Sequence, residues 1–410
     1  MRMIMFLPKA IFCRVFQAAF RMALPILPYR EPEIINSCSA LGDVLRKEQV
    51  SSVLVVTDKG IVNNGLLKPV EAALQACSAA YTVYADTQPN PTVRNVEDAL
   101  QVYHKNRCNA IIAIGGGSAM DCAKAVGVRV VYPKRTLNQL GGKLKAWRRL
   151  PTLIAIPTTA GTGSETTLAA MITDTASHRK YAIMSFPLIP HYAVLDASLT
   201  YSLPPHLTAT TGVDALTHAV EAYIGRSTTK ETRKLALEAT KLIFDNVEAA
   251  YKNGKDHQAR ENMLYAAYKA GIAFSKSYVG YIHALAHALG GKYSTPHGLA
   301  NAVLMPYVLE AYEERVHKKL HQLGIAAGVA AKENSPAEGA AKFIHAVKQL
   351  NASMNIPAKL TGIRREDIPV LAKHAEREAN PLYPVPVLMT QKELECFYHQ
   401  AADWENQNHR

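Results

Sequence analysis

Five side chains that bind metals or protons lie at spacings that could bring them together. Asp214 and His218 are four residues apart and so share one helix face, and His283 and His287 repeat that spacing. His297 follows ten residues later, at an expected turn before another helix. Each residue alone is compatible with an ordinary core or surface position. Together, on otherwise apolar helices where unpaired polar groups are costly, they favour a site for Fe(II) or Zn(II), which both accept nitrogen and oxygen ligands.

A glycine-rich turn, Ile114-Gly115-Gly116-Gly117-Ser118-Ala119-Met120-Asp121, follows one of the apolar runs and opens an expected helix. Glycines there let backbone N–H groups approach a diphosphate, and a helix N-terminus adds positive potential. The turn is not the G-x-G-x-x-G dinucleotide fingerprint, and a tight structural connection would also explain it. Asp121 lies in the first helical turn, where an acid interacts favourably with the helix dipole.

Two further features suggest nucleotide binding. The loop from Pro157 to Glu165 follows another apolar run, and five of its six positions from Thr158 to Gly163 are glycine or threonine. These positions supply many small donors for phosphates or a carboxamide. Asp58 ends the first clear strand, where a carboxylate can accept from ribose hydroxyls and repels a 2′-phosphate, which favours NAD over NADP. A helix N-cap is the alternative role for Asp58.

The elements that must position these residues change in type along the chain. Short apolar runs at 53–57, 81–84, 110–114 and 153–156 alternate with helical stretches, which predicts a parallel sheet covered on both faces. After residue 205 long helical patterns dominate, including 208–224, 230–251, 259–275 and 304–331. The chain of 410 residues is long enough for two domains, and we place their boundary near 205.

The net charge of +12 comes from two acid-free segments, residues 1–30 and 129–149, and the rest of the chain is close to neutral. No zinc-finger, helix-turn-helix or aromatic-interleaved basic pattern accompanies them, so a nucleic-acid-binding protein is the weakest candidate. A solvated basic face, beside an anionic ligand, explains the charge. The six cysteines are scattered without a C-x-x-C pair, which favours the reducing cytoplasm. No run of apolar residues is long enough to predict an integral membrane segment.

Residues 1–28 form a separate N-terminal amphipathic extension. Basic and apolar residues alternate at helical spacing from Pro8 to Leu24. Such a helix could be a membrane-surface anchor, a transit peptide, or a helix packed on its own protein or on a partner subunit. We favour packing, through burial of the apolar face.

Four motifs in this order, GGGSAMD, PTTAGTGSE, DALTHAVEAY and GYIHALAHALGGKYSTPHGLANA, closely resemble the iron-containing (group III) alcohol dehydrogenase family. The likeness runs from about Leu27 to the C-terminus. It implies an α/β plus all-α protein of the dehydroquinate synthase-like fold: a Rossmann-like, parallel-sheet dinucleotide-binding domain over 29–205 and a helical metal-binding domain over 206–410, with the active site in the cleft between them. The first 25 or so residues lie outside the family.

The resemblance also assigns roles to residues. It implies that Asp214, His218, His283 and His297 are the metal ligands, and that His287 lies near the substrate as a proton relay. Gly116, Gly117 and Ser118 would hold the NAD pyrophosphate, and Asp58 the adenosine ribose. The other expected cofactor-binding residues are Asn90, Gly115, Asp121, Thr158, Thr159, Thr162 and Lys180.

The activity implied is hydride transfer between NAD(H) and a primary alcohol or diol and its aldehyde, with Fe(II), or else Zn, as the metal. Alternatives with the same fold are a zinc-dependent polyol (glycerol-type) dehydrogenase, a lyase of the dehydroquinate-synthase type, and a non-catalytic assembly protein. The expected partners are a small-molecule alcohol or aldehyde and further copies of the chain in a homodimer or larger homo-oligomer.

Overall fold

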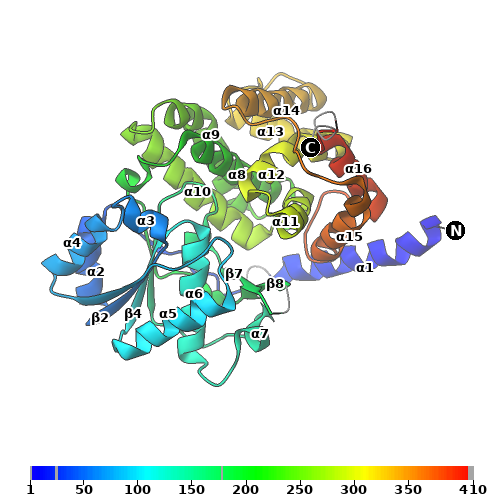
Figure 1. The fold of residues 1–410 in the computed structure, drawn as a ribbon. Coiled ribbons are helices and arrows are strands. Elements are labelled where there is room, and N and C mark those ends of the chain that lie inside the picture. The colour runs from blue at the N-terminus through cyan, green and yellow to red at the C-terminus, as the bar shows by residue number, and fades with distance from the viewer. Residues whose placement is uncertain (1, 24–25, 177–178, 405–410) are drawn as a thin grey trace. The chain divides into compact units, whose positions relative to one another are not determined.

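The computed structural model describes residues 2–23, 26–176 and 179–404, and the chain divides into two compact units. The sheet unit comprises Pro28–Leu203 and Lys255–Leu264, and the helical unit comprises Met1–Leu27, Pro204–Gly254 and Tyr265–Arg410 (Figure 1).

The sheet unit is built on six parallel strands in the order β1-β9-β6-β4-β2-β3. The four strands predicted from apolar runs are confirmed, and they form the centre and one edge of this sheet. Two three-residue strands at the other edge were too short to be recognised as a pattern. The strands are β1 (Glu33–Ile35), β2 (Ser52–Val56), β3 (Ala80–Tyr84), β4 (Ala110–Gly115), β6 (Thr152–Pro157) and β9 (Tyr192–Val194).

Helices cover both faces of this sheet, as the uninterrupted apolar strands require. In β4, Ile111 and Ala113 pack into the core beneath α5 (Val93–Lys105) and α6 (Gly117–Val131), whereas Ile112 and Ile114 pack beneath α2 (Leu41–Lys47) and α4 (Lys68–Ala76) (Figure 1). Alternate side chains of one strand therefore enter different cores. The unit also contains the short helices α3 (Lys59–Asn63) and α7 (Leu137–Leu140).

A second, smaller sheet lies beside α6. The antiparallel pair β7 (Ala169–Asp174) and β8 (Arg179–Met184) is extended by the two-residue strand β5 (Gly142–Lys143), which runs parallel to β8. The sequence patterns did not predict these strands.

The helical unit contains α1 (Arg2–Ala23), α8 (Pro205–Ile224), α9 (Lys230–Lys252), α11 (Tyr281–Tyr293), α12 (His297–Ala311), α13 (His317–Ala326), α14 (Pro336–Ser353), α15 (Ile368–Ala379) and α16 (Gln391–Ala401). Helix α10 (His257–Ser277) begins in the sheet unit and continues into the helical unit. The helical stretch predicted over 304–331 is interrupted in the structure. Helix α12 ends at Ala311, and Glu313 adopts a positive φ of 49° before α13 begins.

Helix α1 packs on the segment between α15 and α16, within its own chain. Gln17, only 4% exposed, donates to the carbonyls of Pro381 (3.3 Å) and Tyr383 (2.7 Å). Arg14 donates to the carbonyls of Val385 (2.7 Å) and Pro386 (3.0 Å). The helix therefore packs on its own protein, but through polar side chains that find carbonyl acceptors there.

The expectation that α1 buries its apolar face was wrong. Ile11, Phe12 and Val15 are 56–63% exposed on the other side of the helix, whereas Cys13 is buried beside Gln17. Across residues 2–23, 26–176 and 179–404, no helix combines the length and the hydrophobicity that crossing a bilayer requires.

We predict that Gln17→Leu lowers the thermal stability of the protein. The substitution leaves two carbonyls without the donor that Gln17 supplies, and such a loss costs about 1–3 kcal/mol. Thermal unfolding followed by circular dichroism measures the effect, with Gln101→Leu on the exposed face of α5 as the matched control. Equal midpoints for the two variants would show that α1 is not held by these bonds.

Candidate metal centre and cofactor loops

Four of the five side chains singled out by spacing converge in the helical unit. Asp214 and His218 project from α8, His283 projects from α11, and His297 is the first residue of α12. One ligand atom from each residue lies within 4.8 Å of the others. The structure thus brings together a carboxylate and three imidazoles from three helices.

The centre of this cluster is closed to water on one side. The Asp214 and His283 side chains are 3% and 2% exposed, whereas His297 is 38% exposed. Nε2 of His283 lies 3.8 Å and Nε2 of His297 lies 3.4 Å from Oδ1 of Asp214. Nε2 of His283 is buried and has no hydrogen-bond partner among the described residues. A divalent cation between the four residues would satisfy this nitrogen, so the donor set fits a metal ion.

Glu221 orients His283 by contacting the ring nitrogen that faces away from the cluster. No sequence motif had singled out Glu221. Its Oε2 lies 2.6 Å from Nδ1 of His283, and its two carboxylate oxygens also accept from the backbone N–H groups of Gly280 and Ile282, both at 2.8 Å. A proton on Nδ1 leaves Nε2 as the lone-pair nitrogen facing the cluster. Burial raises the pKa of the Glu221 carboxyl to about 7, against the lowering effect of these N–H donors.

Close helix contacts bring Glu221 and His297 into place. A Cβ on Gly280 would lie 2.7 Å from Oε1 of Glu221, and a Cβ on Gly298 would lie 2.4 Å from the carbonyl oxygen of Thr210 on α8. Glycine is therefore required at both positions. Asn301, one turn after His297, donates to Oδ1 of Asp214 (2.7 Å) and lies 3.1 Å from Nε2 of His297. The spacing of Glu221 seven residues after Asp214 was the only sequence signal for it.

His287 lies outside the group of four and has a different partner. Its Nδ1 is 2.6 Å from Oε1 of Glu378 on α15, and the Tyr383 hydroxyl donates to the same oxygen at 2.7 Å. Its ring stacks on that of His297, with centroids 5.1 Å apart. Burial raises the pKa of the Glu378 carboxyl, but His287 and Tyr383 lower it more, and the net pKa lies below its usual range. Glu378 thus stands as a carboxylate ready to stabilise a charged imidazole.

In the sheet unit, the two predicted loops meet where their parallel strands end. The register pairs Gly115 at the end of β4 with Pro157 at the end of β6. A Cβ on Gly117 would lie 3.2 Å from the Thr162 side chain, and one on Gly116 would lie 3.7 Å from Thr159 Oγ1. The loops therefore form one surface at the carboxyl edge of the sheet, where ligands of open α/β sheets bind.

Asp58 follows β2 at the same edge. Its Oδ1 accepts from the backbone N–H of Ile61 at 3.1 Å, so it is the N-cap of α3, as one of the two interpretations proposed. Its Oδ2 lies 3.4 Å from where a Cβ on Gly115 would be. One carboxylate oxygen caps the helix, and the other lies beside the glycine turn.

The other predicted cofactor residues surround the same turn. The Asn90 backbone N–H donates to Oγ of Ser118 at 3.3 Å, and Lys180 donates to the Asn90 side chain at 2.7 Å. The backbone N–H of Thr158 donates to the carbonyl of Gly115 at 3.1 Å. Asp121 accepts from Oγ of Ser164 (3.1 Å) and from the N–H of Met171 (3.0 Å). The structure therefore brings all the predicted cofactor residues to this edge, with Asp121 tying α6 to the second loop.

Lys124, which the sequence analysis missed, holds the second loop from below. It is fully buried, and its ammonium group donates to the carbonyls of Ser164, Thr167 and Ala169 and to the hydroxyls of Ser164 and Thr167, at 2.6–3.1 Å. Burial lowers the pKa of Lys124 to about 8 and raises the pKa of the neighbouring Glu165 carboxyl to about 7. Its position three residues after Asp121, on the same helix face, was the available signal.

Comparison with known proteins assigns the family. Residues 35–197 match the family model for iron-containing alcohol dehydrogenase, and residues 208–402 match that for the C-terminal part of the Fe-containing alcohol dehydrogenase family. The chain belongs to the iron-containing alcohol dehydrogenase family. This membership confirms the resemblance, the fold class and an oxidoreductase acting on alcohols and aldehydes.

Individual relatives agree with this assignment. The chain is 39% identical over 367 residues to alcohol dehydrogenase 4 of Saccharomyces cerevisiae, covering 88% of this chain and 94% of that protein. A crystal structure of 1,3-propanediol oxidoreductase matches with a TM-score of 0.88 and 34% identity, over 92% of this chain and 99% of that one. The structure of sulfoacetaldehyde reductase from Bifidobacterium kashiwanohense in complex with NAD+ matches with a TM-score of 0.82 and 27% identity, over 92% and 99% of the two chains.

We predict that Lys124→Met destabilises the sheet unit. The substitution keeps the volume but removes the donor for five buried oxygen atoms, at a cost on the order of 3 kcal/mol or more. Urea unfolding monitored by circular dichroism measures the change, with Lys105→Met at the exposed end of α5 as the control. If the two variants unfold at the same urea concentration, the bonds of Lys124 contribute nothing to holding the loop.

Proposed function

We propose that the protein oxidises primary alcohols or diols with NAD+, and reduces the corresponding aldehydes with NADH, at a divalent metal held by Asp214, His218, His283 and His297. The observation that carries this proposal is the buried Nε2 of His283, which faces the other three side chains and has no hydrogen-bond partner in the described part of the chain. Fe(II) is the metal that we expect, with Zn(II) as the alternative, because the donor set suits both. A zinc-dependent polyol dehydrogenase is therefore the second candidate.

The chain supplies three functions around the reacting alcohol. A metal ion in the four-residue cluster, when bound, polarises the hydroxyl and lowers its pKa. Asp214 and the three imidazoles fix the position of that charge, and Glu221 keeps the lone pair of His283 directed at it. The exposure of His297, 38%, leaves one side of the cluster accessible to a small substrate.

His287 can take up the proton that leaves the alcohol. Its Nδ1 is bonded to Glu378, so the other ring nitrogen can accept a proton while the carboxylate stabilises the resulting imidazolium. The Tyr383 hydroxyl donates to the same carboxylate oxygen and fixes its direction. In aldehyde reduction the same nitrogen returns the proton.

The loops at the carboxyl edge of the sheet provide the NAD site in this proposal. Backbone N–H groups of Gly116, Gly117 and Ser118 hold the pyrophosphate at the N-terminus of α6. The free side of the Asp58 carboxylate accepts from the adenosine ribose. NAD+ held by these residues would supply the hydride acceptor for the alcohol. The homo-oligomer and the cytoplasmic location expected from the sequence stay predictions.

We predict that His297→Ala abolishes metal retention and turnover while the protein stays folded, because it removes one of four ligands at an accessible position. Metal analysis after dialysis, together with anaerobic assays of Fe(II)-loaded protein against alcohols and diols, measures both effects. His206→Ala, exposed at the start of α8, is the matched control. Near-wild-type turnover by metal-stripped enzyme would rule out the proposed chemistry.

We predict that His287→Gln separates proton transfer from metal binding. The variant keeps the four ligands and so retains metal, but it loses the group that accepts the proton, which lowers kcat by about 10²–10⁴-fold. Metal content and kcat are measured on the same preparation. Loss of metal in this variant would make His287 a ligand, and an unchanged kcat would remove it from the reaction.

We predict that Asp58→Asn relaxes the preference for NAD over NADP. Asparagine caps a helix as well as aspartate does, so α3 is retained while the charge that repels a 2′-phosphate is removed. The ratio of kcat/KM values should shift toward NADP by about tenfold, which corresponds to about 1.4 kcal/mol. Asp43→Asn on α2 is the charge-matched control. Equal use of NADPH and NADH by the wild-type enzyme would contradict the role of Asp58.

A further inference from the structure

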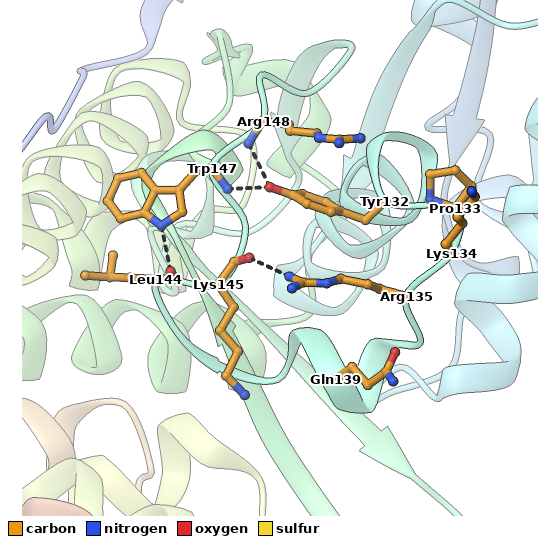
Figure 2. Close-up of a pocket in the computed structure, with 9 residues that line it drawn as sticks. All are labelled: Tyr132, Pro133, Lys134, Arg135, Gln139, Leu144, Lys145, Trp147 and Arg148. Carbon is orange, nitrogen blue, oxygen red and sulfur yellow. Dashed lines mark hydrogen bonds between the residues drawn. The ribbon is translucent and has the colours of Figure 1, made fainter.

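The sheet unit contains a hollow of about 950 Å³ that the proposed reaction does not use. It lies in the segment between the C-terminal end of α6 and the start of β6, and four of its nine lining residues are cationic (Figure 2). We call it the basic hollow and define it by Tyr132, Lys134, Arg135, Lys145, Trp147 and Arg148. All of its lining residues come from the second acid-free segment of the sequence, residues 129–149.

Within residues 2–23, 26–176 and 179–404, no carboxylate pairs with the charges of the basic hollow. Lys134, Arg135, Lys145 and Arg148 line it together with neutral residues, and no carboxylate contributes to the lining. Among the described residues none of these four side chains forms an ion pair, whereas Arg129, nearby in the sequence, is paired with Glu97 at 2.6 Å. Four unpaired cations around one concave surface raise the local concentration of an anion.

The two guanidinium groups are held in place before any ligand binds. Figure 2 shows the ring of Tyr132 between Arg148 and Arg135, whose guanidinium carbons lie 5.1 and 5.7 Å from the ring centroid. Arg148 donates to the carbonyl of Val131 and Arg135 to that of Lys145. The Tyr132 hydroxyl accepts from the backbone N–H groups of Trp147 and Arg148. These bonds fix the cations without neutralising them, and each guanidinium keeps further N–H donors.

An exposed aromatic ring adjoins the cations. Trp147 is 54% exposed, although its size and hydrophobicity favour burial. Its indole N–H is already bonded to the carbonyl of Leu144 at 2.7 Å, and Leu144 itself is 41% exposed. The ring also contacts that of Phe186, with centroids 6.2 Å apart. What the indole still offers a ligand is therefore the part of its apolar ring surface that stays exposed, which can stack on a flat heterocycle.

The basic hollow is separate from the NAD loops. The glycine turn opens α6 at Gly117, and the hollow follows its last residue, Val131. A helix of 15 residues is about 22 Å long, so the two places lie at opposite ends of α6. A ligand in the basic hollow is therefore a second ligand of the sheet unit.

We propose that the basic hollow binds a nucleoside di- or triphosphate, with its phosphates on Lys134, Arg135, Lys145 and Arg148 and its base stacked on Trp147. Several cations around one concavity match a multiply charged group better than a single carboxylate, and guanidinium groups match phosphate geometry. The volume is within the range of pockets for small ligands. This inference does not depend on the proposed reaction.

The protein offers a local probe for a test, because Trp147 and Trp404 are its two tryptophans. In a Trp404→Phe background, ATP is added to enzyme saturated with NAD+, so that the dinucleotide site is filled. We expect a saturable change in Trp147 fluorescence. A linear or absent response over the same ATP range would overturn the proposal.

Charge variants and a second probe complete the test. Lys134→Gln/Lys145→Gln removes two cations whose side chains make no hydrogen bond to any described residue, and it should weaken ATP binding about tenfold or more. Lys68→Gln/Lys105→Gln removes two exposed cations elsewhere in the sheet unit and should leave it unchanged. If both double variants weakened ATP binding equally, the effect would come from net charge alone, and the proposed phosphate site would be overturned. Inorganic tripolyphosphate should bind more weakly than ATP, and binding as tight as that of ATP would overturn the role of Trp147.

Discussion

The burial of charged and polar ligand atoms among apolar helices is the constraint on which the helical unit depends. Asp214 and the nitrogen atoms of His283 lie where solvent cannot reach them, and leaving such groups unsatisfied is costly. Glu221 satisfies one nitrogen of His283 and takes three donors for itself. The other nitrogen, Nε2, faces the cluster. The packing of α8, α11 and α12 therefore keeps a buried lone pair unsatisfied, and a cation could coordinate it. Because that cation would bind the folded chain, its binding free energy would add to stability.

In the sheet unit the corresponding constraint is to hold two loops in a fixed conformation, and buried side chains of α6 do this. Its two loops present backbone N–H groups and small hydroxyls, which can approach a phosphate closely but have no rigidity of their own. Lys124 supplies that rigidity, since one buried ammonium group bonds to five oxygen atoms of the residues 164–169. Asp121 adds a second tie from α6. The buried ammonium group of Lys124 therefore holds in place a loop whose own donors are uncharged backbone N–H groups and hydroxyls.

Helix α1 lies outside the residues that match the family models, yet it contacts the segment that carries the partners of His287. Gln17 and Arg14 hold the backbone from Pro381 to Pro386, and Lys9 pairs with Glu376 on α15 at 2.6 Å. The segment 376–386, which these contacts hold at both ends, carries Glu378 and Tyr383, which bond to each other and direct His287. The amino-terminal extension thus stabilises the carboxylate that fixes the proposed proton relay, from the opposite end of the sequence.

Local patterns in the sequence determined the strands at the centre of the sheet, the main helices, the two loops rich in glycine and threonine, and the placement of Asp214 and His218 on one helix face. Periodicity and spacing are properties of neighbouring residues, so the sequence alone carries them. Family likeness added the choice of ligands. Only the tertiary structure decided that Glu221 orients His283 across 62 residues of sequence, that Lys124 lies under the second loop, and that α1 turns its apolar side outward. Each of these depends on which donor meets which acceptor when distant segments pack. Local spacing places Glu221 and Lys124 on a helix face but does not identify their partners. The basic hollow is a further case. The sequence shows only a run of basic residues, whereas the tertiary structure places the guanidinium groups of Arg135 and Arg148 against the ring of Tyr132.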